Sequence, residues 1–325
     1  MQDDPQPIPI DLGGAEPAPW FPVRRLVWPT EPRSIRSLIL ALGLFAVTAL
    51  STLAAGAQFA AAYAANESPG FDSFFSDYFR PFAEPRLFLS GIPFALTLLG
   101  ILLAHELGHF FACRHYHINA TYPYFIPAPT LIGTLGAFIR IRSPIFNRRA
   151  LFDMALAGPL VGFVIAVPAL ALAIIFSKVV PPSAASPPLI FGQPLIEKLL
   201  ELYFRPGVPH VNLLLHPVGR AAWVGLFATA LNLLPAGQLD GGHILYSVAS
   251  EQHRRVSFAV AILLVPLAVK FWTGWLVWAV LLVAIGFRHP PLIDRWEPLG
   301  RTRRILSGVA LGIFILCFMP APFVV

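Results

Sequence analysis

The chain has 325 residues, of which 56% are hydrophobic and only 12% are charged. Ordinary soluble domains are about 45–50% apolar and about 25% charged, so this composition excludes a typical soluble protein and indicates a multi-pass membrane protein. The formal net charge of +6 does not point to nucleic acid, because the basic residues cluster as arginines beside apolar segments, where they orient membrane helices. We therefore expect the lipid bilayer as a partner and no nucleic-acid partner.

Residues 1–33 are rich in proline and acidic side chains, and we expect them to form a flexible tail. A secretory signal would begin with a basic region followed by a short apolar core, and a transit peptide would be rich in Arg and Ser and poor in acids. The tail shows neither pattern, which favours a bacterial membrane over an organellar one.

Apolar segments follow along the rest of the chain. A helix needs roughly 20 residues to cross a bilayer, and the segments that we expect to cross are 34–63, 87–113, 150–176, 217–234, 256–287 and a last one that begins near residue 305. Lys270 and Gly274 interrupt 256–287, which forms either one long helix or a hairpin of two short helices. The loop at 178–215 contains a short amphipathic segment near 195–204.

The connection at 114–149 is neither a simple polar loop nor a clear crossing. Prolines at 123, 127 and 129 exclude a helix in its first half. In its second half, at 133–142, β-branched and aromatic residues stand between glycines, which predicts short strands.

The arginines set the predicted orientation, because cytosolic loops carry an excess of basic residues. The four nearest the N-terminus place that end in the cytosol, and they are Arg24, Arg25, Arg33 and Arg36. The arginines between 288 and 304 also fall inside if 256–287 crosses twice, so we prefer the hairpin. The sequence therefore predicts a polytopic α-helical membrane protein with about seven transmembrane helices, and with a membrane-associated β-loop between the second and third.

The second apolar segment contains the motif His-Glu-Leu-Gly-His at 105–109. On a helix, His105 and His109 lie four residues apart on one face, where two imidazoles can bind one zinc ion. Glu106 then lies beside the metal and can take a proton from a water molecule there. Ionisable residues inside a membrane helix are costly and usually functional, so this motif predicts a zinc site with Glu106 as the catalytic base.

A catalytic zinc needs a third protein ligand and an open position. We expect Asp153 to cap a helix or pair with its dipole, because it follows a loop and precedes an apolar segment. His216 opens the fourth segment on the outer side and lies at the wrong depth, and we expect His243 to pack or cap. Asp240 lies just past the cytosolic end of that segment, after a break at Pro235, and can meet the two histidines at one depth.

Together these motifs resemble the site-2 protease family of intramembrane zinc metalloproteases. The resemblance rests on the motif at 105–109 and on Asn-Leu-Leu-Pro-Ala-Gly-Gln-Leu-Asp-Gly at 232–241. The segment 133–138 is similar to the membrane-associated β-loop of the family, and 153–159 to the start of its following helix. The similarity covers 87–250 and is greatest to the branch with chloroplast and bacterial members. No segment between the spans is long enough for the PDZ domain of one large bacterial branch.

The resemblance implies a zinc metalloendopeptidase that cleaves within or near transmembrane segments of other membrane proteins, with Zn²⁺ as cofactor and Asp240 as the third ligand. It also places Asn232 near the site, where the amide either pairs with backbone freed by Pro235 or donates to the oxyanion of the tetrahedral intermediate. Gly133 and Gly136 either serve turns alone or belong to a strand that pairs with substrate.

We expect four regions: a cytosolic tail at 1–33, the first transmembrane helix and an outer loop at 34–86, the catalytic core at 87–250, and C-terminal transmembrane helices at 251–325. The predicted location is a bacterial cytoplasmic membrane, with the N-terminus and the active site toward the cytosol. Two alternatives stay open, a catalytically silent chaperone that binds membrane helices and a membrane zinc peptidase that acts on soluble peptides. A metal transporter is disfavoured, because its ionisable residues would be spread through several spans.

Overall fold

The computed structural model describes residues 35–67, 74–180, 190–290, 292–294 and 297–324. The predicted flexible tail at 1–33 lies outside the described residues, as do Arg24, Arg25 and Arg33, on which part of the predicted orientation depends.

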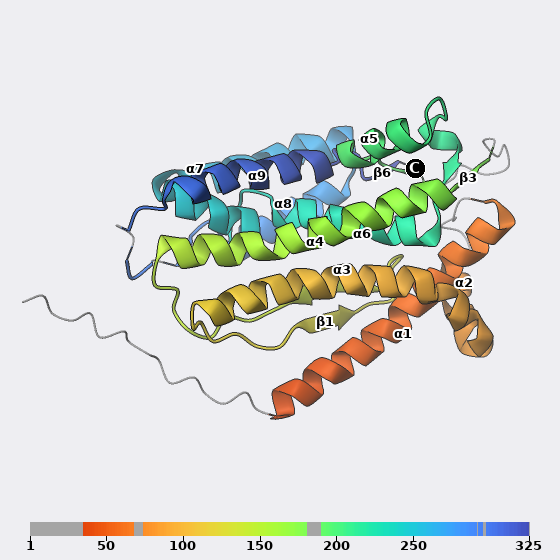
Figure 1. The fold of residues 1–325 in the computed structure, drawn as a ribbon, viewed down its shortest axis with the longest axis horizontal. Helices are drawn as coiled ribbons and strands as arrows, with labels where there is room; N and C mark the ends of the chain where they lie inside the picture. Colours follow the sequence, from red (N-terminus) through yellow and green to blue (C-terminus); the bar gives the residue numbers. More distant parts are fainter. Residues whose placement is uncertain (1–34, 68–73, 181–189, 291, 295–296, 325) are drawn as a thin grey trace, which may run out of the picture. The chain divides into compact units, whose positions relative to one another are not determined.

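The described residues are mostly helical (Figure 1). The helices are α1 Ile35–Ala65, α2 Phe74–Ala83, α3 Phe88–His115, α4 Arg148–Phe176, α5 Leu195–Phe204, α6 Pro217–Asn232, α7 Asp240–Lys270, α8 Gly274–Ile285 and α9 Arg301–Cys317. Two short 3₁₀ helices are η1 Pro85–Leu87 and η2 His210–Asn212. The strands are β1 Tyr124–Pro127, β2 Thr134–Phe138, β3 Lys178–Val179, β4 Ile190–Phe191, β5 Leu213–Leu214 and β6 Phe323–Val324.

Within the described part of the chain, 4 helical segments are long and apolar enough to cross a membrane, namely α1, η1 with α3, α4 and α7. The first three confirm the segments predicted at 34–63, 87–113 and 150–176, within two residues at each end. The amphipathic segment predicted at 195–204 is α5. α6 falls in the fourth predicted segment, but its 16 residues span only about 24 Å, which is less than the roughly 30 Å of a hydrocarbon core.

The region 256–287 contains parts of two helices, as the hairpin prediction required. α7 ends at Lys270, α8 begins at Gly274, and the two helices pack against each other. α7 begins well before the predicted apolar segment, at Asp240, and contains a non-helical residue at Ala249. α8 has 12 residues, or about 18 Å, and is too short to cross a bilayer as a straight helix.

α6 is the buried centre of the helical assembly. Its Leu226 packs in a cluster with residues of α4 and α9, Trp223 packs with residues of α1 and α3, and Leu231 packs with residues of α7 and α8. A helix that is apolar all round is typical of an element enclosed by protein on every side. Both ends of α6 are therefore held firmly among other helices.

β1 and β2 form an antiparallel hairpin in which Phe125 lies opposite Ala137. α1 holds this hairpin in place: the Ser51 hydroxyl donates to the Gly133 carbonyl at 2.6 Å, and the ring of Phe45 meets that of Phe125 edge-on. The prediction of strands in 133–142 is confirmed by β2. The proline-rich stretch before it also forms a strand, β1, which the sequence analysis described only as non-helical.

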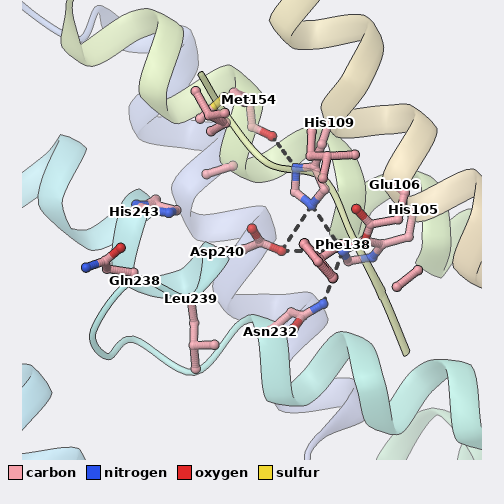
Figure 2. Close-up of a pocket in the computed structure, with 14 residues that line it drawn as sticks. His105, Glu106, His109, Phe138, Met154, Asn232, Gln238, Leu239, Asp240 and His243 are labelled. Atoms are coloured by element: carbon pink, nitrogen blue, oxygen red, sulfur yellow. Dashed lines mark hydrogen bonds and ion pairs between the residues drawn. The ribbon is translucent and has the colours of Figure 1, made fainter. Parts of the chain in front are cut away.

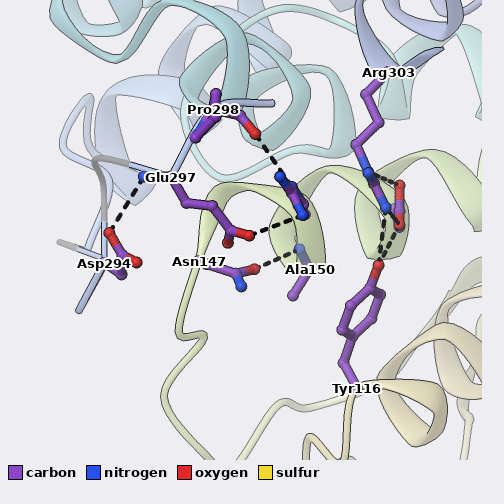
Figure 3. Close-up of polar contacts among 9 residues, drawn as sticks. Tyr116, Asn147, Ala150, Asp294, Glu297, Pro298 and Arg303 are labelled. Atoms are coloured by element: carbon purple, nitrogen blue, oxygen red, sulfur yellow. Dashed lines mark hydrogen bonds and ion pairs between the residues drawn. The ribbon is translucent and has the colours of Figure 1, made fainter. Parts of the chain in front are cut away.

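Asp153 of α4 ties α4 to α9 and to the end of α3, and its partners Arg303 and Tyr116 are labelled in Figure 3. Its carboxylate accepts from Arg303 Nε at 2.8 Å and Nη2 at 2.6 Å, and also from the Tyr116 hydroxyl. The expectation that Asp153 caps α4 or pairs with its dipole is wrong. The N-cap is Asn147, whose side chain accepts from the Ala150 N–H at 2.9 Å. Asp153 lies beyond the first turn, where the guanidinium group of Arg303 binds it.

We expect Asp153→Asn to lower the thermal stability of the purified protein, because an amide cannot accept both of the charge-assisted hydrogen bonds that the Arg303 guanidinium group donates. The expected loss is about 1–3 kcal/mol, measured as a lower midpoint of thermal unfolding in detergent. Glu84→Gln is the control, since Glu84 and Arg80 form an exposed pair and such pairs contribute little. Equal midpoints for Asp153→Asn and the wild type would show that this interhelical contact carries no stability.

Candidate active site

α3 carries His105, Glu106 and His109 among the surrounding helices, where their exposed fractions are 5%, 6% and 8%. The two histidines stand one helical turn apart, and their Nε2 atoms lie 3.1 Å from each other. The spacing of the sequence motif therefore produces the expected convergence of two imidazole nitrogens.

Asp240, the first residue of α7, reaches both histidines (Figure 2). Its Oδ2 lies 3.4 Å from His105 Nε2 and 3.3 Å from His109 Nε2. α6 ends at Asn232 and the chain turns before Asp240, in agreement with the break predicted at Pro235. The structure thus brings together the three residues that the sequence analysis proposed as ligands.

The turn between α6 and α7 is held from a distant part of α7. The Gly237 N–H donates to Ser257 Oγ at 3.1 Å, and the Gly237 carbonyl lies 3.0 Å from His253 Nε2. Gly237 has a φ of +56°, a conformation that glycine adopts at little cost. These contacts fix the position from which Asp240 enters the site, and the sequence analysis did not identify them.

The three donor atoms fit a tetrahedral metal ion. Zinc binds nitrogen and oxygen ligands at about 2.0–2.2 Å, which separates neighbouring ligands by about 3.3–3.6 Å in a tetrahedron. The separations of 3.1, 3.3 and 3.4 Å are close to these values. His109 Nδ1 lies 2.8 Å from the Met154 carbonyl oxygen. A carbonyl can only accept, so Nδ1 carries the proton and Nε2 presents its lone pair.

Glycines of α4 make room for the histidines. A β-carbon at Gly158 would overlap the His109 imidazole, and one at Gly162 would lie 3.2 Å from His105 Nδ1. The two glycines stand four residues apart, as the histidines do, so that matching turns of α3 and α4 face each other. This role of the glycines was not predicted, although its signal, two glycines at the helical spacing of the histidines, is present in the sequence.

A cavity of about 210 Å³ lies beside the donor atoms. Glu106 lines it from α3, Phe138 from β2 and Asn232 from α6 (Figure 2). Gln238 and Leu239, from the turn before α7, line the cavity as well, and neither was predicted. A carboxylate next to a histidine ligand and an amide at the same cavity supply a proton acceptor and a hydrogen-bond donor.

The remaining predicted positions fall in different places. Asn232 lies at the site, with Nδ2 3.1 Å from His105 Nε2. His243 lines the cavity, and its Nδ1 lies 2.8 Å from His289 Nε2. His216 caps the beginning of α6 by accepting from the Val218 N–H at 3.3 Å, at the end of α6 opposite to Asn232.

Gly133 and Gly136 belong to the hairpin and do not line the cavity. Gly133 precedes β2, has a φ of +78° and packs against the backbone of α1. Gly136 lies within β2 with a φ of +102°. The residues that follow it, Ala137 and Phe138, do line the cavity, so β2 reaches the site through its last residues.

We expect Gly158→Ala to reduce bound metal and catalytic turnover together, because the added methyl group overlaps the His109 ring and displaces its Nε2. The measurement is metal content per chain after loading with Zn²⁺. Gly100→Ala is the matched control on α3, since nothing lies within 4 Å of a β-carbon at that position, and alanine there favours the helix slightly. Unchanged metal content in Gly158→Ala would show that His109 is not held by this contact.

Comparison with known proteins bears on the chemistry of this site. The sequence profile of peptidase family M50 matches residues 93–272. The chain is 34% identical over 245 residues to the probable zinc metalloprotease EGY1, chloroplastic, of Arabidopsis thaliana, which covers 71% of this chain and 43% of that protein. It is 28% identical over 336 residues to EGY1 of Oryza sativa subsp. japonica, covering 98% and 57%.

A further relative is the probable zinc metalloprotease EGY2, chloroplastic, of Oryza sativa subsp. indica, 32% identical over 251 residues that cover 74% of this chain and 45% of that protein. The chain thus spans about half the length of these curated relatives. The matched region, which is more than half of the chain, contains the three donor residues and Glu106. The chain therefore belongs to peptidase family M50, the site-2 protease family of zinc metalloproteases.

Proposed function

We propose that the chain is a zinc metalloendopeptidase that cleaves peptide bonds within or near transmembrane segments of other membrane proteins. One observation carries this proposal: two histidines, a glutamate and an aspartate meet at one cavity, on helices that are themselves apolar enough to cross a membrane. Ionisable groups in such surroundings are costly and mark a function. In this proposal the substrate is a transmembrane protein that reaches the cavity from within the bilayer.

The chain supplies every residue that peptide hydrolysis requires. His105, His109 and Asp240 would hold a zinc ion, which would supply Lewis-acid polarisation of the scissile carbonyl and a water molecule of lowered pKa. The Glu106 carboxylate takes the proton from the attacking water and then delivers it to the leaving nitrogen. The Asn232 amide donates to the carbonyl oxygen as negative charge develops there.

β2 offers a place for an extended substrate. A transmembrane helix hides its carbonyls in hydrogen bonds, so the substrate must unwind before cleavage, and an edge strand can hold it by adding a strand. Among the described residues β2 pairs only with β1. Nothing lies within 4 Å of the β-carbon position of Gly136, and Leu135 is 68% exposed. We therefore propose that the strand preceded by Gly133 and containing Gly136 pairs with substrate.

The membrane arrangement belongs to the same proposal. We propose about seven transmembrane segments, of which α6 and α8 are shorter than the hydrocarbon core and do not cross it alone. We also propose a membrane-associated β1–β2 hairpin, a catalytic core at 87–250, and an active site that faces the cytosol with the N-terminus. The long apolar helices support a membrane location, and the arginines near the end of α3 and in the hairpin connection support the orientation, because they follow the positive-inside rule. The relatives are named as chloroplast proteins, which does not support the bacterial host membrane expected from the sequence.

We expect Glu106→Gln to abolish cleavage of a co-expressed membrane protein while zinc stays bound, because the amide cannot accept the proton from water. The expected loss in turnover is at least about 10²-fold. Membrane proteomics of the native host, comparing Glu106→Gln with the wild type, should show uncut or pre-trimmed membrane proteins that accumulate in the variant.

Two companion variants sharpen this experiment. Glu251→Gln removes an exposed carboxylate and should cleave normally, whereas Asn232→Ala should lower kcat by about 10²–10³-fold with little change in KM. Cleavage that persists in Glu106→Gln would overturn its assignment as the base. Activity of the wild type on a short peptide without any apolar span would favour the rival peptidase that acts on soluble substrates.

We expect Leu135→Cys to form a disulfide with an uncut substrate that carries a single cysteine. The disulfide should form when the substrate cysteine lies at every second position around the cleavage site, because a paired strand alternates its side chains. The native cysteines, Cys113 and Cys317, are fully buried and should not interfere. The experiment uses the Glu106→Gln background so that the substrate stays whole. Leu172→Cys on α4, with 59% exposure at the native leucine, is the control, and equal cross-linking from both positions would rule out pairing at β2.

A further inference from the structure

A second cluster of metal-ligating side chains lies at the opposite end of α6. Glu197 and Glu201 stand one turn apart on α5, and His210 in η2 turns toward them. One donor atom from each residue lies within 4.8 Å of the others. α6 runs about 18 Å from Arg220, which borders this cluster, to Asn232, which borders the catalytic cavity. The two groups of donors are therefore separate.

A buried carboxyl group such as that of Glu197 must be neutralised, either by a cation or by a proton. Its side chain is 0% exposed, and neither carboxylate oxygen has a hydrogen-bond partner among the described residues. An unpaired carboxylate in such surroundings costs several kcal/mol. Arg220, itself 8% exposed, is within electrostatic range of both glutamates, but its guanidinium lies over the Phe191 ring at 4.1 Å and makes no hydrogen bond to Glu197.

The orientation of His210 places its Nδ1 beside the carboxylates, where it can act as a metal ligand. Its Nε2 lies 3.3 Å from the Phe191 carbonyl oxygen, which can only accept, so this nitrogen carries a proton. Its Nδ1 lies 2.9 Å from Glu201 Oε1. Nδ1 therefore has two states: as an imidazolium it donates a second proton to Glu201, and as a neutral ring it presents a lone pair that, beside two carboxylates, can bind a cation.

The supporting contacts are those that accompany a metal site. A backbone carbonyl on the far nitrogen of a histidine fixes its tautomer, and a polar group on a ligating carboxylate fixes its rotamer. Phe191 supplies the first contact for His210. The Gln193 amide donates to Glu201 Oε2 and supplies the second.

We propose that Glu197, Glu201 and His210 bind a second divalent metal ion of the zinc or manganese class, distinct from the catalytic ion. Two carboxylates and one imidazole suit these ions. The ion would join α5 to the segment that leads into α6, and so would hold the N-terminal end of α6. This inference does not depend on the proposed protease activity.

The test is metal stoichiometry of the purified full chain after loading with Zn²⁺ or Mn²⁺ and removal of free ions. With Zn²⁺ the wild type should retain about two ions per chain, and a His105→Ala/His109→Ala variant should retain about one. A Glu197→Gln/Glu201→Gln variant should also fall from about two ions to one, and Glu84→Gln, which alters an exposed carboxylate, should retain both. His210→Ala provides a milder second variant that should also lose one ion.

Zinc X-ray absorption of the His105→Ala/His109→Ala variant should show a ligand shell dominated by oxygen, as two carboxylates require. A wild type that retains only one ion per chain after loading with Zn²⁺, and again only one after loading with Mn²⁺, would overturn the proposal. An unchanged stoichiometry in Glu197→Gln/Glu201→Gln would also overturn it, and the buried carboxylates would then be neutralised by protons. Size-exclusion profiles equal to the wild type confirm that each variant is folded.

Discussion

The meeting of three charged or polar ligand atoms inside an apolar helical assembly is the constraint on which this structure depends. Donor atoms 3.1–3.4 Å apart are unfavourable neighbours unless a cation or protons lie between them. Each must also be aimed at one point by groups that the chain provides elsewhere. The Met154 carbonyl orients His109, and the turn at Gly237 positions Asp240. Two glycines of α4, Gly158 and Gly162, leave space for both imidazoles.

The surrounding fold can be understood as the support for that arrangement. α6 is enclosed by the other helices, so its C-terminal end holds Asn232 at the cavity. α1 carries the β1–β2 hairpin through Ser51 and Phe45, and the hairpin in turn lines the cavity with Phe138. Near the beginning of α4, the contact of Asp153 with Arg303 and Tyr116 joins α4 to α9 and to the end of α3.

Both groups of ligating residues follow one physical rule. Each pairs two residues at helical spacing with a third from a distant segment: His105 and His109 with Asp240, and Glu197 and Glu201 with His210. A pair on one helix costs little to preorganise, since its spacing is fixed by the helix. The third residue joins the helix to another part of the chain, so metal binding at either position would also join elements of the fold.

The sequence by itself determined the long apolar helices, the break before Asp240, and the pairing of His105 with His109, because these depend on local composition and on helical periodicity. It also predicted the place of β2, whose glycines and β-branched residues are a local signal. Only the tertiary structure decided that Asp153 binds Arg303 instead of capping α4, and that Gly158 faces His109. The same is true of the convergence of Glu197 and His210, because each of these contacts joins residues whose side chains meet only after the helices have packed.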